Sequence, residues 1–551
     1  MTPPRPEYPR PRLRRERWVN LNGEWDFGAG EEPRFDRRIM VPFCPQAELS
    51  GIAERVPGDV LWYRTRFAAP VADRLLLHFG AVDYRARVLV NGVEVARHEG
   101  GHTPFTADLT AVAEGPDNEL VVRVEDPAGD ATIPRGKQTW KEISETIFYT
   151  PTSGIWQTVW LEPLPSRHLR ALRVRPDLEG GLVALEIDAD GEVDVTASLD
   201  GEVAGRWKGP AGGCRVALDP VVPWSPESPR LYDLRVALLD PSGAPVDEVE
   251  SYFGLRSIEA RDGRFLLNGR PYIQRLVLDQ GYFPGGLLTA PSDADLRRDI
   301  ELAKALGFNG ARKHQKVEDP RWVFWADRLG FLVWGELPNF HQYSPEAERR
   351  LRSEWEAAVI RDRDHCSIVA WVPVNESFGL QALEDGARSR FLTRFHRLTH
   401  HLDGTRPVVS NDGWQHAETD LCSLHDYAGP EQLARRYRTL DVALEPNARP
   451  SPAHLSGYAH RGEPLIVSEF GGLRLAGAGG WAQGEVRDPA QLAEVYRAEV
   501  EALMGPGPVE GFCYTQLTDV EQERNGLLTF DRRPKAEVDR LRSATETAKR
   551  R

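Results

Sequence analysis

Cysteine and methionine are scarce in this chain of 551 residues, which contains five cysteines and three methionines. The cysteines are scattered, odd in number and never spaced as a CxxC pair, which argues against a disulfide framework or a cysteine-ligated metal centre. We therefore expect reduced thiols buried in hydrophobic cores, at Cys44, Cys214, Cys366, Cys422 and Cys513.

Long apolar runs are also lacking. No window approaches the ~20 apolar residues that a membrane-spanning helix requires. The N-terminal stretch MTPPRPEYPRPRLRRERWVN contains basic side chains with no apolar stretch after them, which is not the pattern of a secretory signal peptide. A cytoplasmic location without a membrane partner is the expectation that follows.

An excess of basic residues is absent too. Lys and Arg number 69, Asp and Glu number 83, and the formal net charge is −14. The two signs are interspersed, so the surface offers no general attraction for nucleic acid. A neutral sugar or another small ligand is compatible with this charge, and the chain could form a homo-oligomer. The length predicts about three or four domains.

Residues 1–165 are typical of short strands joined by turns, and we predict an all-β jelly-roll sandwich. The pairs Asn22-Gly23 and Asn91-Gly92 each lie between alternating apolar residues. Asn-Gly in that position is a strong hairpin signal, because both central residues of the turn need positive φ.

Residues 166–255 form a second, shorter β pattern. The segments LVALEIDA, EVDVTASL and LYDLRVALLD each alternate apolar and polar side chains with a period of two. A Pro-rich loop, PWSPESPRLY, leads into the last of them. A length of about 90 residues fits an immunoglobulin-like β-sandwich.

Residues 256–551 change to a helical period between apolar strands. Ser292 is expected to cap a helix with Asp295 as its capping-box partner. A second helix is expected to begin after Asp319 and to end at Gly330. Strands and helices that alternate at this spacing indicate parallel βαβ units.

Eight apolar segments in about 300 residues match a C-terminal (β/α)8 TIM barrel. The expected strands are residues 271–278, 308–312, 331–336, 367–375, 406–411, 421–425, 464–469 and 511–516.

Two of these strands end in a glutamate. The fourth strand ends in Asn375-Glu376 and the seventh in Glu469. Active sites of such barrels form at the C-terminal strand ends, and these two ends lie roughly across the mouth from each other. Retaining glycoside cleavage needs one carboxyl group that protonates the leaving oxygen and another that attacks the anomeric carbon. The pair therefore predicts glycosidase chemistry, although a single glutamate could equally be an ion-paired strand end.

Several longer motifs resemble glycoside hydrolase family 2, the group of β-galactosidases, β-glucuronidases and β-mannosidases. The first domain contains NLNGEWDF, VPFCPQAELSGI, WYRTRF and SGIWQTVWLE, and the barrel contains RDRDHCSIVAWVPVNES and VSEFGG, in family order. The resemblance covers nearly the whole chain. It implies a jelly-roll sugar-binding domain, an immunoglobulin-like sandwich and a catalytic barrel.

The same resemblance implies roles for individual residues. Glu376 would be the acid/base and Glu469 the nucleophile. Asn375 would bind the sugar 2-hydroxyl, Arg312 would support the nucleophile electrostatically, and Tyr427 would donate a hydrogen bond to it.

Other polar or aromatic residues lie at or just beyond strand ends and are candidates for substrate contacts. His314 and His425 could bind hydroxyls, and Trp414 could stack on a sugar face, although a core tryptophan is an equal alternative. These histidines show no HxH or HExxH spacing, so we expect no metal site and no required cofactor; a bound cation is left open. The remaining candidates are Asp279, Glu336, Asp412 and Tyr514.

One loop of the first domain, PRGKQTWKE, contains Lys137, Gln138 and Trp140. It could reach the cleft, but a solvated loop is the expected state.

The chain also departs from the family pattern. Asp279 and Gln280 occupy the position where many family members have a Gly-Val-Asn-x-His motif. Tyr514 occupies a position where a tryptophan is frequent. The Asn-x-Lys motif with which glucuronidases hold the uronate carboxylate is not found.

We accordingly expect an exo-acting retaining glycosidase, with a β-galactoside as the leading substrate. A β-mannoside, a β-glucuronide or an arabinoside remain alternatives. Two further alternatives are a non-catalytic carbohydrate-binding protein and a transglycosidase.

Overall fold

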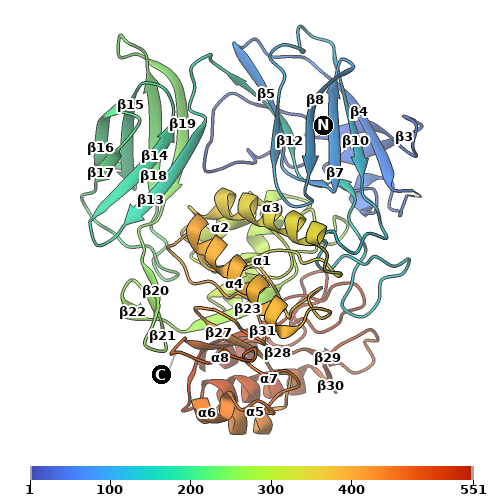
Figure 1. Cartoon of the computed structure of the whole chain (residues 1–551), viewed down its shortest axis with the longest axis vertical. Helices are drawn as coiled ribbons and strands as arrows, with labels where there is room; N and C mark the ends of the chain where they lie inside the picture. The colour runs from blue at the N-terminus through green and yellow to red at the C-terminus, as the bar shows by residue number, and fades with distance from the viewer. Residues whose placement is uncertain (1–2, 57, 548–551) are drawn as a thin grey trace.

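The computed structural model describes residues 3–56 and 58–547 and consists of two β-sandwiches above a helix-covered barrel (Figure 1). This arrangement confirms the predicted fold class of jelly roll, immunoglobulin-like sandwich and TIM barrel. The predicted domain boundaries after residues 165 and 255 stay a prediction. The first predicted domain begins at residues 1–2 and the last ends at residues 548–551, and both of these ends lie outside the described residues. No helix of the described chain is long and apolar enough to cross a membrane.

The first sandwich packs a six-stranded sheet on a four-stranded sheet, and the paired strands of both are antiparallel. Alternation along β10 places Leu120, Val122 and Val124 in its core. In sheet order, the strands are β3 (Arg37–Val41), β2 (Gly23–Ala29), β4 (Val60–Phe67), β10 (Asn118–Glu125), β7 (Arg85–Val90) and β8 (Val93–Glu99), then β1 (Val19–Asn20), β12 (Val159–Leu164), β5 (Arg74–Phe79) and β9 (Phe105–Asp108).

The two Asn-Gly pairs have different outcomes. Asn91 and Gly92 have φ values of 51° and 80° and join β7 to β8 in a hairpin, as predicted. The hairpin prediction was wrong for Asn22-Gly23, because β1 pairs with β12 in one sheet whereas β2 pairs with β3 in the other. The Asn22 side chain stabilises this crossing, since its Oδ1 accepts a hydrogen bond from Val159 N at 3.0 Å.

The second sandwich packs three strands on four. Its predicted alternating segments coincide with strands whose inward residues, such as Val193, Val195 and Ala197, are fully buried. The strands are β13 (Ala171–Asp177), β14 (Leu182–Asp188) and β17 (Cys214–Ala217), facing β16 (Glu202–Pro210), β15 (Glu192–Leu199), β18 (Tyr232–Leu239) and β19 (Pro245–Phe253).

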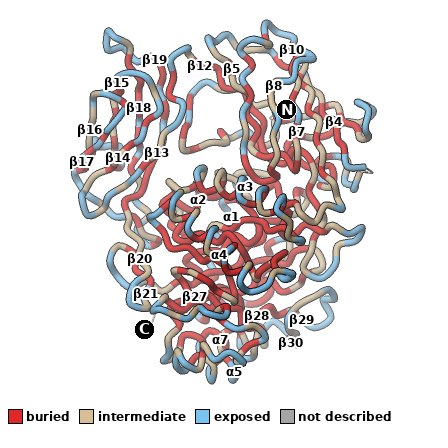
Figure 2. The backbone as a smooth tube through the Cα atoms, in the orientation of Figure 1, coloured by how far each residue is buried: buried red, intermediate tan, exposed pale blue. Residues whose placement is uncertain are grey.

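Seven parallel strands line the barrel in the order β26-β25-β24-β23-β31-β28-β27. Figure 2 shows that buried residues concentrate here and inside each sandwich. In chain order, the strands are β23 (Gln274–Asp279), β24 (Gly310–Lys313), β25 (Leu332–Glu336), β26 (Ile368–Val372), β27 (Cys422–His425), β28 (Leu465–Gly471) and β31 (Val509–Thr515).

The predicted fifth strand, residues 406–411, is not a strand. The segment makes isolated parallel bridges at Val408 and Asp412. Pro407 has no N–H, and the Val408 N–H donates to the Asp420 carboxylate at 2.7 Å instead of to β27. The segment therefore lies between β26 and β27 and is joined to β26 by an isolated bridge at Trp371, without forming a continuous strand.

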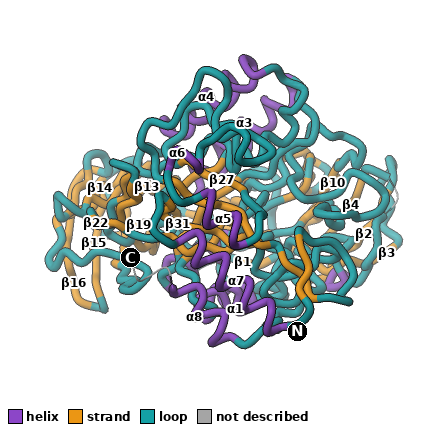
Figure 3. The backbone as a smooth tube through the Cα atoms, turned by 90° about the horizontal axis from the view of Figure 1, so that it is seen from below, coloured by secondary structure: helices purple, strands orange, loops and turns teal. Residues whose placement is uncertain are grey.

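Helices surround the strands when the molecule is viewed from below (Figure 3). Ser292 caps α1 by accepting from Asp295 N, and Asp319 caps α2, which ends at Gly330 with a φ of 68°, as predicted. The helices are α1 (Asp293–Ala305), α2 (Pro320–Leu329), α3 (Pro345–Asp362), α4 (Asp385–Leu402), α5 (Pro430–Arg436), α6 (Leu440–Ala443), α7 (Pro489–Met504) and α8 (Val538–Glu546).

Short elements complete the chain. They are the 3-10 helix Glu48–Ser50, the pair β6 (Val82–Asp83) and β11 (Gly154–Ile155), the sheet β20 (Ile258–Arg261), β21 (Arg264–Leu267) and β22 (Arg270–Pro271), and the pair β29 (Leu473–Leu475) and β30 (Gly484–Val486). All five cysteines are free and buried, which confirms that expectation.

Candidate active site

Glu376 and Glu469 meet at the mouth of the barrel. Glu376 follows the end of β26, and Glu469 lies within β28. A carboxylate oxygen of one lies within 4.8 Å of a carboxylate oxygen of the other. The imidazole of His425 contacts both: its Nδ1 is 2.6 Å from Glu376 Oε1, and its Nε2 is 3.4 Å from Glu469 Oε1. Two carboxyl groups this close can act on the same anomeric carbon.

The backbone at Glu376 is strained. Glu376 and Ser377 have φ values of 51° and 54°, in the left-handed region that residues with a side chain rarely adopt. Two hydrogen bonds hold this turn, from Glu376 N to Asp412 O at 2.9 Å and from Ser377 N to Asn411 Oδ1 at 2.8 Å. Conformations of this kind cluster at functional sites, where the surrounding structure maintains them.

Arg312 is fully buried at the end of β24 and contacts several polar side chains of the site. Its guanidinium donates to Glu469 Oε1 at 2.8 Å and to Asn375 Oδ1 at 2.6 Å. The same group donates to Glu336 Oε2 at 2.6 Å and pairs with Asp412 Oδ2 at 2.7 Å. Because the bond to Asn375 occupies the acceptor of that amide, its NH2 group is the part that can donate to a sugar hydroxyl.

Tyr427 engages the other oxygen of Glu469. Its hydroxyl donates to Glu469 Oε2 and lies 3.4 Å from Thr515 Oγ1. Arg312 and Tyr427 thus hold the two oxygens of Glu469, which fixes the orientation of that carboxylate.

The charges around Glu469 favour its ionised form. Burial alone would raise the pKa of Glu469, but the positive charges of His425 and Arg312 outweigh burial and hold it below its usual range. Burial also disfavours the charged form of His425 and would lower its pKa, but the negative charges of Glu469 and Asp412 raise that pKa to about 10. His425 is therefore cationic at neutral pH, and Glu469 is an anion, the state that a nucleophile requires.

Sequence reasoning missed two asparagines that support the turn at Glu376 and Ser377. Asn339 Oδ1 accepts from Asn375 N at 2.8 Å, and Asn411 accepts from Ser377 N. Both follow or end predicted strands, so a search for every polar residue at a strand end would have found them.

Three family descriptions match the chain. "Glycosyl hydrolase 2 galactose-binding domain-like" matches residues 37–153, "Glycosyl hydrolases family 2" matches residues 168–256, and "Glycosyl hydrolases family 2, TIM barrel domain" matches residues 258–488. The chain belongs to glycosyl hydrolase family 2. The protein is therefore a glycoside hydrolase that acts on a glycoside substrate.

Relatives of this family 2 hydrolase have more than one named activity. A "Beta-glucuronidase" of Paenibacillus borealis is 26% identical over 97% of this chain and 98% of that protein. A "Beta-galactosidase" of Thermoanaerobacter pseudethanolicus is 25% identical over 77% of this chain, which spans only 59% of that longer protein. The solved β-glucuronidase from Ruminococcus gnavus in complex with D-glucuronic acid has a TM-score of 0.81 and 22% identity, over 97% of this chain and 99% of that one, which shows a shared fold.

Two predicted substrate contacts of the family 2 hydrolase have partners within the chain. Asp279 Oδ2 pairs with Lys313 Nζ at 2.8 Å, and His314 Nδ1 lies 3.0 Å from Glu336 Oε1. Burial, with the positive charge of Arg312, holds the pKa of His314 well below its usual value, so this ring is neutral. Both residues support the site from within the barrel.

The two predicted aromatic contacts differ. Trp414 is partly exposed, and its ring lies 5.5 Å from that of His425, at the mouth. Tyr514 is fully buried, and its ring packs 4.9 Å from Tyr496 of α7. Strand alternation turns Tyr514 outward to the helix layer, so the prediction that it binds substrate was wrong.

The loop with Lys137, Gln138 and Trp140 is not solvated, contrary to the prediction. Lys137 is 7% exposed and Gln138 2%. Gln138 Nε2 donates to Asp83 Oδ2 at 3.0 Å, and the Trp140 ring lies 4.1 Å from that of His341 in the barrel. Contacts with a distant domain, which local composition does not reveal, bury this loop.

One HExxH sequence occurs in the family 2 hydrolase, at His98–His102, outside the predicted mouth. It begins with the last two residues of β8 and continues into a loop, so its histidines do not share a helix face as they do in zinc enzymes. The His98 ring stacks on Phe105 at 4.4 Å, and the His102 ring lies 5.3 Å from Trp156. His102 N also donates to Glu354 Oε2 of α3 at 3.2 Å, so the sequence takes part in the packing between domains.

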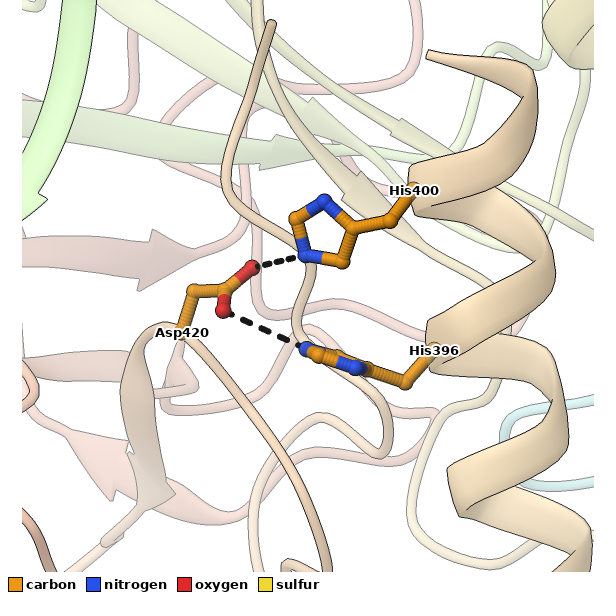
Figure 4. Close-up of side chains that lie close together, drawn as sticks. All are labelled: His396, His400 and Asp420. Carbon is orange, nitrogen blue, oxygen red and sulfur yellow. Dashed lines mark hydrogen bonds and ion pairs between the residues drawn. The ribbon is translucent and has the colours of Figure 1, made fainter. Parts of the chain in front are cut away.

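A second histidine cluster lies away from the two glutamates. His396 and His400 on α4 point toward Asp420, and their Nε2 atoms lie 3.3 Å and 2.8 Å from its carboxylate oxygens (Figure 4). Asp420 also accepts from Val408 N. The cluster therefore ties α4 to the irregular segment that replaces the fifth strand.

Replacing His400 by glutamine is expected to weaken this tie in a pH-dependent way. The hydrogen bond to Asp420 raises the pKa of His400, so the stabilisation is complete below the unfolded value of about 6.5 and is lost as pH rises through the higher folded value. The side chain is 36% exposed, which limits the effect to about 1 kcal/mol or less. Urea unfolding should show the loss at pH 5.5 and not at pH 9, with the exposed neighbour His401→Gln as control. Equal destabilisation at both pH values would contradict this role.

Proposed function

We propose that this family 2 hydrolase releases terminal β-glucuronic acid with retention of configuration, using Glu376 as acid/base and Glu469 as nucleophile. The observation that carries the mechanism is the approach of the two carboxylates to within 4.8 Å. Retaining enzymes hold their carboxyl groups about 5–5.5 Å apart, whereas inverting enzymes need about 6.5–9.5 Å to admit a water molecule.

The first step forms a covalent glycosyl-enzyme. Protonated Glu376 gives its proton to the glycosidic oxygen while a Glu469 oxygen attacks the anomeric carbon and the aglycone leaves as an alcohol. Arg312 and Tyr427 hold the attacking carboxylate in place. The Asn375 amide binds the 2-hydroxyl in this proposal, a contact that strengthens as the oxocarbenium-like state develops.

The second step returns the enzyme to its starting state. The Glu376 carboxylate takes a proton from water, the resulting hydroxide equivalent attacks the anomeric carbon, and Glu469 leaves as a carboxylate. Two inversions give net retention. A sugar hydroxyl in place of water would give transglycosylation through the same intermediate.

The choice of a glucuronide rests on the relatives. The Paenibacillus relative, which matches the chain along nearly the whole length of both proteins, is named a β-glucuronidase. A β-galactoside, the leading substrate expected from the sequence, is the second candidate, supported by the Thermoanaerobacter relative. Membership of a hydrolase family sets aside the alternative of a non-catalytic binding protein.

A panel of p-nitrophenyl β-glycosides tests the proposal. We expect kcat/KM for the glucuronide to exceed that for the galactoside and the mannoside by at least about 100-fold, because a site built for a charged group rejects analogues that lack it. Proton NMR of the first sugar released should show the β-anomer. A galactoside preference would overturn the substrate, and an α-anomer formed first would overturn the retaining mechanism.

A further inference from the structure

A loop of the first sandwich forms part of the active-site wall. The loop joins β10 to β11, and Gly136 N donates to Asn339 O at 3.0 Å. A Cβ on Gly136, whose φ is 58°, would lie only 2.5 Å from Gln315 O, so the loop backbone lies directly on the barrel. Asn339 in turn binds Asn375, the residue before the acid/base. Asn339 therefore binds both this loop and the segment that contains Glu376.

Aromatic contacts fix the same loop beside Glu376. The rings of Trp140 and Phe148 lie 4.1 Å and 5.2 Å from that of His341. Phe148 also lies 6.4 Å from Phe378, two residues beyond Glu376. This contact places the loop at the edge of the mouth.

Lys137 of this loop is a largely buried cation that forms no ion pair with any carboxylate of the described residues. It is 7% exposed, and its Nζ lies 6.0 Å from the centroid of the Phe148 ring. Among the residues that the structure describes, no carboxylate oxygen lies within 4.0 Å of this Nζ. By contrast, the buried Lys313 and Lys316 both pair with Glu318. Keeping an unpaired ammonium on a largely buried side chain is unfavourable, so a lysine in this position favours an anionic ligand.

The charge of Lys137 affects two buried groups, His314 and Glu523. Burial and the charge of Arg312 lower the pKa of His314, and Lys137 lowers it further. Burial raises the pKa of Glu523, and Lys137 opposes that rise. Since His314 lies 3.0 Å from the Arg312 guanidinium, the ammonium belongs to the same electrostatic environment as the nucleophile.

We propose that Lys137, supplied by the sandwich loop and not by the barrel, binds the carboxylate of the terminal uronic acid. This inference rests on the proposed glucuronidase function and names the group that selects the acidic sugar. Lys137 would supply the cation for the uronate carboxylate in a chain that has no Asn-x-Lys motif for this purpose. A lysine that binds the C6 carboxylate should distinguish a glucuronide from a glucoside, because the two differ only in the oxidation state of C6.

The test compares p-nitrophenyl β-glucuronide with p-nitrophenyl β-glucoside in the wild type and in Lys137→Met. We expect kcat/KM for the glucuronide to fall about 100-fold, the effect of losing a hydrogen bond to a charged group, while the glucoside value changes little. Inhibition by D-glucuronate should weaken in parallel, and Lys137→Arg should retain part of the preference. Lys141→Gln is the matched control, because this lysine of the same loop is 51% exposed and pairs with Glu145.

The outcomes separate the two proposals. If the wild type prefers a neutral glycoside, the glucuronidase function fails, and the role of Lys137 fails with it. If the wild type prefers the glucuronide and Lys137→Met retains the same glucuronide-to-glucoside ratio, only the assignment of Lys137 is overturned. Equal losses for both substrates would show that Lys137 supports the loop structurally, which also overturns its role as a carboxylate ligand.

Discussion

Glu469→Ala is expected to abolish turnover of every glycoside, with a loss in kcat on the order of 10⁶, the size seen when a covalent nucleophile is removed from another hydrolase. The expectation follows from the position of Glu469, which receives hydrogen bonds from Arg312 and Tyr427 and remains ionised beside His425. Initial rates of nitrophenol release measure the loss.

Added azide makes this experiment specific to the nucleophile. In Glu469→Ala, azide can enter the space left by the carboxylate and attack the anomeric carbon from that side, giving an α-glycosyl azide that NMR identifies. Glu499→Gln is a matched control: Glu499 is a buried carboxyl on α7, and burial raises its pKa to about 8, so a neutral amide should be tolerated. An active Glu469→Ala variant without azide would remove the assignment.

Local signals predicted the helix ends correctly because the physics that sets them is local. Ser292 binds a backbone N–H three residues away, and Gly330 supplies the left-handed turn at the end of α2. The positions of Glu376 and Glu469 were also predictable, because a barrel of parallel strands collects every C-terminal strand end at one face.

The failures lie where distant residues compete with a local pattern. The apolar segment at 406–411 has the composition of a strand, but Asp420 takes the N–H of Val408. Asn22-Gly23 resembles a hairpin turn, but its asparagine binds another strand. In each case one side-chain hydrogen bond to a residue outside the local segment outweighs the local preference.

The contacts within the site were beyond sequence reasoning for the same reason. Arg312 reaches its partners across 24, 63 and 157 residues of chain, at Glu336, Asn375 and Glu469 respectively. The resemblance to a family implied a supporting arginine, but not that His425 would lie between both glutamates. Only the folded barrel brings these groups together.

Glu376→Ala is expected to have an effect that depends on the leaving group. A methyl or disaccharide glycoside should lose about 10²–10⁴-fold in kcat/KM, the usual contribution of a general acid, because its alkoxide cannot leave without a proton. A 2,4-dinitrophenyl glycoside should lose little in the first step, since its phenolate is a stable anion. Its second step should slow, because no base remains to activate water, so a burst of dinitrophenol should precede a slow steady state.

One further measurement distinguishes this role from a general loss of structure. Azide should accelerate the slow step of Glu376→Ala and give a β-glycosyl azide, since it attacks the glycosyl-enzyme from the face opposite Glu469. Glu376 contacts His425 Nδ1 at 2.6 Å, so a variant in which the imidazole collapses could mimic part of the rate loss but would not produce a β-azide. A uniform loss across all leaving groups, with no azide product, would place the acid/base elsewhere in the barrel mouth.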